Sequence, residues 1–250
     1  MKHSHTRKIL FAVLACAGGA AASAQSAPAA ASAPSTLNVA VGGVISPGSC
    51  TPTSGAIAFD MKKINPASLK DKAETPLAPI VQPLSIKCDG GDAAVALSVA
   101  GTVKAPTPSD AALEHKATGI QAEAKKGYIY DLVDAATSTT RIGRYVFQFR
   151  NFQYTTAAAN GKQAKALVVT SSDRAAWANA ADTAANAAQL KSDGTTYVTF
   201  VDPATPTVPV SASLFNGDIV IGAVIQPKSE LTINTDLTFR GETTITLSYL

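Results

Sequence analysis

Apolar and polar residues alternate over many short stretches of this chain. The final stretch, 243–250, places Ile245, Leu247 and Tyr249 on one side and polar residues on the other. A two-residue period is typical of a β-strand with one buried face. The same pattern predicts further strands at 37–41, 55–61, 84–88, 94–101, 128–133, 142–149, 197–201, 208–215, 218–225 and 231–239. Short strands at this spacing predict a β-sandwich.

One segment interrupts the strand pattern. Residues 172–191 are rich in alanine, with Ser172 or Asp173 as a candidate N-cap and Gly194 after the end. A helical period places Trp177 on one face with three alanines, Ala181, Ala184 and Ala188. We therefore predict one inserted helix that is anchored by Trp177, with a ligand platform at Trp177 as the alternative. Aromatic residues make up only 6% of the chain, so we expect a core of mostly Val, Ile, Leu and Ala.

The first 24 residues carry the features of a secretory signal peptide. Three basic residues precede a short apolar run, and small residues at 22–24 provide a cleavage site. Cleavage would remove three of the 21 Lys and Arg residues and none of the 18 acids, so the exported chain would be formally neutral. A neutral chain argues against nucleic-acid binding, which needs a basic surface. Acylation of Cys16 is the alternative way to process this leader.

Two cysteines, Cys50 and Cys88, remain after the leader. An even number of cysteines in an exported chain predicts a disulfide. We expect no metal at this pair, because no histidine cluster accompanies it. Residues 25–36 contain almost only Ala, Ser and Pro and predict an extended N-terminal segment before a domain at 37–250.

No catalytic motif stands out in the sequence. His115 is the single histidine after the leader, and it lies in a polar stretch. Asp131 and Asp134 are close in sequence, but we interpret them as exposed, solubilising charges. The sequence contains no nucleophile elbow, phosphate-binding loop or zinc signature. We therefore expect no enzyme activity and no cofactor.

Several motifs together resemble the subunits of chaperone–usher pili, and more narrowly a fimbrial-type protein family of Proteobacteria. These motifs are "LNVAVGGVISPGSCTP", "LSIKC", "IGRYV", the segment with Trp177, and the terminal "GETTITLSYL". The resemblance covers 37–250. It implies an incomplete immunoglobulin-like sandwich that lacks its last strand, which leaves a hydrophobic groove beside the C-terminal strand.

The resemblance also implies partners for this groove. A periplasmic chaperone lends a strand, and at the outer-membrane usher a neighbouring subunit replaces it with its own N-terminal segment. Here the resemblance assigns Leu37, Val39 and Val41 as candidates for the donated strand, with the 25–36 segment as the alternative. The groove strand would comprise Gly241, Ile245, Leu247, Tyr249 and Leu250, and basic chaperone residues would hold the terminal carboxylate. The expected location is the cell surface, in a fimbrium that contributes to adhesion.

Two other functions compete with this one. A self-contained secreted sandwich that binds a carbohydrate or surface ligand would pair its last strand on both edges within the chain. A hydrolase would depend on His115.

Overall fold

The structure, a computed structural model, describes residues 49–52, 57–106, 113, 127–179 and 187–250. They belong to one compact unit, Ile45–Leu250. The signal peptide, the 25–36 extension, the three donor candidates Leu37, Val39 and Val41, and His115 all lie outside the described residues. Among the described residues, no helix is long and apolar enough to cross a membrane.

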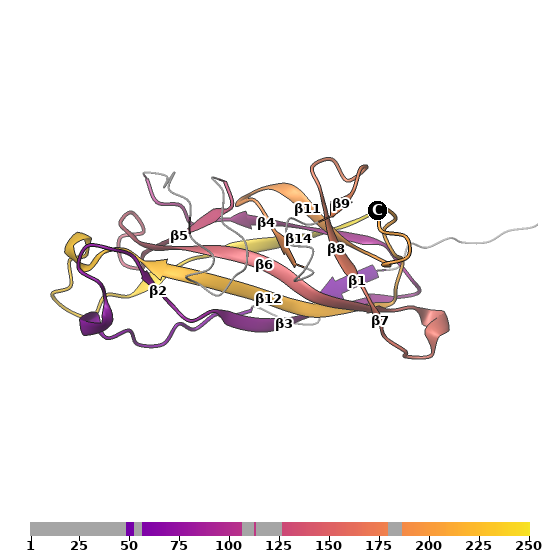
Figure 1. The fold of residues 1–250 in the computed structure, drawn as a ribbon, viewed down its shortest axis with the longest axis horizontal. Coiled ribbons are helices and arrows are strands. Elements are labelled where there is room, and N and C mark those ends of the chain that lie inside the picture. The colour runs from indigo at the N-terminus through magenta and orange to yellow at the C-terminus, as the bar shows by residue number, and fades with distance from the viewer. Residues whose placement is uncertain (1–48, 53–56, 107–112, 114–126, 180–186) are drawn as a thin grey trace, which may run out of the picture. The chain divides into compact units, whose positions relative to one another are not determined.

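Two antiparallel sheets form a β-sandwich, which confirms the predicted fold class. The larger sheet has the order β1-β3-β12-β6-β5-β13, and β2, β7 and β10 pair along its sides. Figure 1 shows β3, β12 and β6 side by side at its centre. Its strands are β1 (Ser49–Pro52), β2 (Thr75–Pro76), β3 (Ile80–Asp89), β5 (Ile129–Asp134), β6 (Arg141–Thr155), β7 (Ala164–Lys165), β10 (Ala187–Gln189), β12 (Leu214–Ile225) and β13 (Phe239–Arg240).

The smaller sheet has the order β14-β4-β11-β8-β9. Its strands are β4 (Val95–Gly101), β8 (Leu167–Ser171), β9 (Ala178–Asn179), β11 (Asp193–Val201) and β14 (Thr243–Tyr249). In Figure 1, β14 runs in yellow beside β4. The helical elements of the described residues are three 3-10 turns, η1 (Pro66–Ser68), η2 (Ala157–Ala159) and η3 (Lys228–Glu230).

The core lies between the two sheets and contains a chain of aromatic rings. Aliphatic side chains are numerous, as the composition predicts, but the largest fully buried side chains include four phenylalanines and a tyrosine. Consecutive ring contacts join, in this order, Tyr145, Tyr130, Phe147, Phe149, Phe152, Phe200 and Phe215. Such pairs add stability beyond their buried area. The few aromatic residues are therefore concentrated where the two layers meet.

The predicted helix at 172–191 is wrong for its described part. Ala178–Asn179 forms β9, which pairs with β8, and Ala187–Gln189 forms β10, which pairs with β6. Asp173 accepts hydrogen bonds from the N–H groups of Ala175 and Ala176, as a helix cap does. Arg174 follows it with φ of +66°, in the left-handed region, so the chain turns and does not continue into a helix.

Trp177 is buried, but not on a helix face. It packs against Ala96 of β4, Val169 of β8 and Val201 of β11. This packing on the smaller sheet leaves no open ring face for a ligand, so the platform alternative is also wrong.

The predicted strand at 218–225 forms part of β12, but the one predicted at 208–215 is wrong for 208–213, which form no strand, and only its last two residues begin β12. The pairing of β12 with β6 shifts between Asn216 and Asp218. Gly217 lies at this bulge, where an added Cβ would come within 2.4 Å of the Phe152 ring. The glycine that resembles a turn signal therefore permits a close approach within a continuous strand.

Cys50 and Cys88 form the predicted disulfide. The two residues are direct partners in the β1–β3 ladder, and both are buried in the core. The bond therefore fixes the short edge strand β1, which has only four residues, to the sheet.

We predict that Cys50→Ser combined with Cys88→Ser lowers the free energy of unfolding by about 4 kcal/mol. The bond closes a loop of 38 residues, and this loss follows from the greater chain entropy of the open loop. Urea denaturation measures the loss. Reductant should shift the wild-type midpoint toward that of the double variant and leave the double variant unchanged. Equal midpoints for the two proteins would contradict the assignment.

Candidate functional site: the groove beside the C-terminal strand

β14 is an edge strand with one free side. It pairs with β4 in continuous register from Thr243 opposite Gly101 to Tyr249 opposite Val95. The N–H of Leu250 donates to the carbonyl of Ala94, which fixes the alternation of the ladder. The even-numbered residues therefore bond to β4, whereas Thr243, Ile245, Leu247 and Tyr249 direct their backbone groups to the other edge. No other strand of the described residues pairs there.

An apolar cavity of about 850 Å³ opens beside this edge. Ile245 lines it, and both Ile245 and Leu247 are only half-buried, although they pack against the core. Well-packed interiors leave few voids larger than a water molecule. This space is therefore an open groove between the layers and not a packing defect. We call it the β14 groove.

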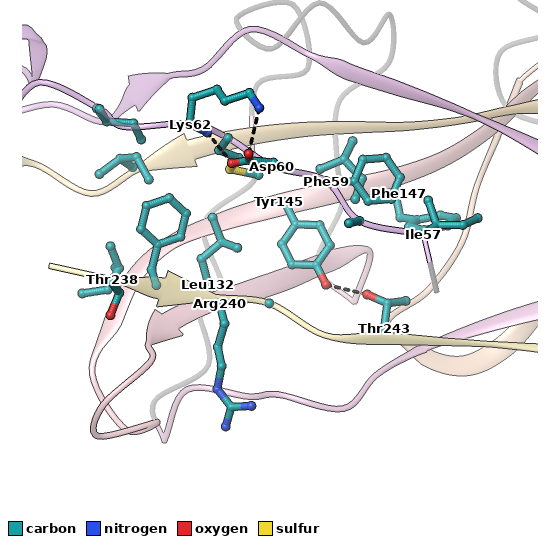
Figure 2. Close-up of a pocket in the computed structure, with 18 of the residues that line it drawn as sticks. Ile57, Phe59, Asp60, Lys62, Leu132, Tyr145, Phe147, Thr238, Arg240 and Thr243 are labelled. Carbon is teal, nitrogen blue, oxygen red and sulfur yellow. Dashed lines mark hydrogen bonds and ion pairs between the residues drawn. The ribbon is translucent and has the colours of Figure 1, made fainter. Parts of the chain in front are cut away.

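The floor and walls of the β14 groove come from both sheets and two connecting segments. Its apolar lining includes Leu84 and Ile86 of β3, Leu97 of β4, Leu132 of β5, Ile142, Tyr145 and Phe147 of β6, Ile219, Ile221 and Ile225 of β12, and Phe239 of β13. Figure 2 shows Ile57, Phe59 and Asp60 on one side, Thr238, Arg240 and Thr243 on the other, and Leu132, Tyr145 and Phe147 between them.

The segment 57–64 forms the flank opposite β14. Ile57, Phe59 and Met61 are half-buried and alternate with exposed residues, so the predicted alternation is real. The predicted strand is not, because these residues join no ladder in the described structure. The carbonyl of Ala58 instead accepts a hydrogen bond from the Gln82 side chain. The groove thus lies between two extended segments, and no strand of the described residues lies between their facing edges.

A side-chain hydrogen bond links the floor of the groove to β14. The Tyr145 hydroxyl and the Thr243 hydroxyl lie 2.5 Å apart, as the dashed line in Figure 2 marks. Burial raises the pKa of Tyr145 to about 12, although the Thr243 hydrogen bond partly offsets this rise. Burial likewise raises the pKa of the stacked Tyr130 far above its ordinary value. Both phenols therefore stay neutral at physiological pH.

Gly241 lets the chain enter β14 close to this floor. An added Cβ would lie 2.7 Å from Cε1 of Tyr145 and 2.9 Å from Cδ2 of Leu132. Any larger residue would push the start of β14 away from Tyr145. Gly241 lines the groove, and its predicted part in binding a donated strand stays a prediction.

Charged residues surround the mouth of the groove in matched pairs. Lys62 lies 2.8 Å from Asp60, and Lys63 lies 3.5 Å from Asp236. Arg240 forms a third pair with Glu242. The Lys62 ammonium also lowers the pKa of the Asp60 carboxyl. Because each charge has an opposite partner, the mouth carries no net charge.

The groove closes where β14 ends. The N–H of Cys50 donates to the Tyr249 hydroxyl at 2.6 Å. This links the end of β14 to β1, two strands that belong to different sheets. Leu250 is 45% exposed, and the anchoring of its carboxylate by a chaperone stays a prediction.

The structure brings the predicted β14 residues together with others that the sequence did not indicate. Gly241 and Ile245 line the cavity, while Leu247 packs on the core and Tyr249 reaches β1. The sequence pattern does not mark Tyr145 or Thr243 as site residues, because a tyrosine in a strand pattern is indistinguishable from any other core residue.

The acids considered for chemistry have structural roles. Asp131 is mostly buried: it lies 3.0 Å from Nε of Arg141 and accepts a hydrogen bond from the Ala105 N–H. The expectation that it is exposed was wrong. Asp134 accepts hydrogen bonds from the Ala136 N–H and the Thr137 hydroxyl and so caps the turn after β5. Within the described ranges, no group of three or more His, Cys, Asp or Glu residues could hold a metal.

A comparison with known protein families found no match, and a comparison with curated proteins found no significant match either. The function of this chain therefore has to follow from its own geometry.

We predict that Gly241→Ala lowers the free energy of unfolding by about 1–3 kcal/mol, because the added methyl group overpacks against Tyr145 and Leu132. Thr244→Ala is the matched control. Thr244 is exposed on the same strand, and its loss should change stability by no more than about 0.5 kcal/mol. Equal urea midpoints for Gly241→Ala and wild type would show that the chain does not approach Tyr145 this closely.

We predict that high pH removes the stability that Tyr145 contributes. Its pKa in the folded state, about 12, exceeds the ordinary value of 10, so the contribution is complete below pH 10 and declines as pH rises toward 12. At pH 11 wild type should have lost about 1.4 kcal/mol relative to Tyr145→Phe, compared with pH 8. Ile245→Val, which changes the groove without a titrating group, should keep a constant difference from wild type. A pH-independent difference for Tyr145→Phe would contradict the burial of this phenol.

Proposed function

We propose that this protein is a non-enzymatic subunit of a chaperone–usher pilus that accepts a strand from another polypeptide into the β14 groove. The observation that carries the proposal is the free edge of β14 beside a cavity of about 850 Å³. An extended strand supplies both things that this site lacks. Its backbone can pair with Ile245 and Leu247, and its alternate side chains can fill the apolar space.

The rival function, a self-contained sandwich that binds a surface ligand, fits the groove less well. A small ligand would fill the cavity, whose volume lies in the usual range for ligand sites. It would leave the backbone groups at the free edge of β14 without partners. An exposed strand edge promotes association with other strands, and proteins normally cover or blunt it. A strand solves both problems at once.

The charges at the groove mouth favour an uncharged strand. The three pairs around Lys62, Lys63 and Arg240 already neutralise one another, so a charged donor gains no new partner. Residues 25–48 of this chain contain no charged side chain, and Leu37, Val39 and Val41 alternate within them. The segment 36–41 of a neighbouring copy is therefore a suitable donor, and export followed by assembly at the cell surface is the expected route.

Amide hydrogen exchange with and without a donor peptide tests the proposal. The probe is the peptide of residues 36–41, capped at both ends to remove its terminal charges. Without peptide, the amides of Ile245 and Leu247 should exchange fast, because they face the free edge. Bound peptide should slow them on the order of tenfold or more, since it gives them hydrogen-bond partners.

The same strand contains the control. Thr244 and Thr246 donate to β4 in either state, so their amides should be protected with and without peptide. Protection of Ile245 and Leu247 in the solitary chain would mean that the strand is already paired from within, and the pilus proposal would fall. Fast exchange that no peptide slows would reject it as well.

A further inference from the structure

Tyr249 differs from the other apolar residues of β14 in what its side chain does. Its backbone faces the free edge, but its hydroxyl reaches the backbone of Cys50 on β1. Tyr249 is 47% exposed, so burial does not explain the placement of its ring. The hydrogen bond to Cys50 is the specific contact that positions it.

The register of β1 explains why the Cys50 N–H is free to donate to the Tyr249 hydroxyl. The N–H of Cys88 donates to the carbonyl of Ser213, so the backbone of Cys88 faces β12 and not β1. Cys50, directly opposite Cys88, therefore turns its own N–H and carbonyl away from β3, toward the open edge of β1. At this level of the sandwich, an inserted strand would use those same backbone groups.

The shape of the cavity agrees with this geometry. Pro52 of β1 and Ile245 of β14 line it, and among the described residues its lining does not extend to Cys50, Leu247 or Tyr249. The lining therefore stops at Pro52 on β1, two residues from Cys50, and at Ile245 on β14, four residues from Tyr249. The disulfide holds Cys50 in place, so β1 cannot shift to lengthen the groove.

We infer that Tyr249 closes the β1 end of the groove and thereby determines where an inserted strand ends. The phenol hydroxyl takes the place that the strand backbone would occupy beside Cys50. A strand that enters the groove pairs with Ile245 and Leu247 and ends near the level of Pro52, unless it displaces this hydroxyl. Tyr249 is thus a specificity-determining residue for the length and register of the strand, and this inference rests on the proposed function.

A peptide-length series tests the inference on the exported full-length chain. The probes are the capped peptide of residues 36–41 and two forms lengthened by one Thr-Val pair, at the N-terminus or at the C-terminus. Each peptide is titrated into wild type and Tyr249→Ala, and the dissociation constant is measured. In wild type, the extension that points toward β1 should gain nothing. In Tyr249→Ala, the same extension should tighten binding several-fold, because Cys50 becomes a free backbone partner. The extension at the other end should change the dissociation constant by the same factor in wild type and in Tyr249→Ala.

Tyr249→Phe provides a second readout if Tyr249→Ala does not fold. It keeps the ring and removes only the hydroxyl, so the Cys50 amide should exchange faster by on the order of tenfold in the complex with the short peptide. Tyr197→Phe on β11 is the matched control and should leave Cys50 exchange unchanged, since Tyr197 packs on a different cluster.

The outcomes separate the two claims. Peptides that bind, but show the same length dependence in wild type and Tyr249→Ala, overturn the role of Tyr249 and leave the proposed function intact. Unchanged Cys50 exchange in Tyr249→Phe overturns that role too. Failure of every peptide to bind wild type rejects strand acceptance itself, and the inference with it.

Discussion

The backbone at the free edge of β14 sets the conditions for the rest of this protein. Peptide N–H and carbonyl groups need partners wherever water is excluded, and the apolar groove excludes water from this edge when it is filled. A side chain or small apolar molecule cannot satisfy a row of such groups, but another backbone can. The half-buried state of Ile245 and Leu247 follows from the same vacancy. The open edge and the open cavity are therefore one feature.

The remainder of the sandwich is built to stay folded around that open side. The aromatic chain from Tyr145, at the floor of the groove, to Phe215 lies between the two layers, and the disulfide fixes the edge strand β1 to β3. A loop-closing bond stabilises the fold by restricting the unfolded chain, so its contribution does not depend on a complete core. Together they let one side of the core remain unfilled.

The sequence predicted the parts of the structure that depend on strong local periodicity. The strands at Leu84–Cys88, in β6 and in β14, and the pairing of Cys50 with Cys88, are all present. Prediction from the sequence failed where tertiary contacts override local preference. The described part of an alanine-rich segment with a capping residue forms strands because Trp177 packs on the smaller sheet and Arg174 takes a left-handed conformation. Ile57 and Phe59 alternate as in a strand, yet alternation reports burial and not hydrogen-bond partners.

The paired charges at the groove mouth affect how any partner could arrive. With Lys62, Lys63 and Arg240 each beside an acid, the entrance projects little electric field into the solvent. Electrostatic attraction, which accelerates many protein encounters, is therefore weak at this entrance. Encounters would depend on diffusion and on short-range fit, and their rate would change little with ionic strength.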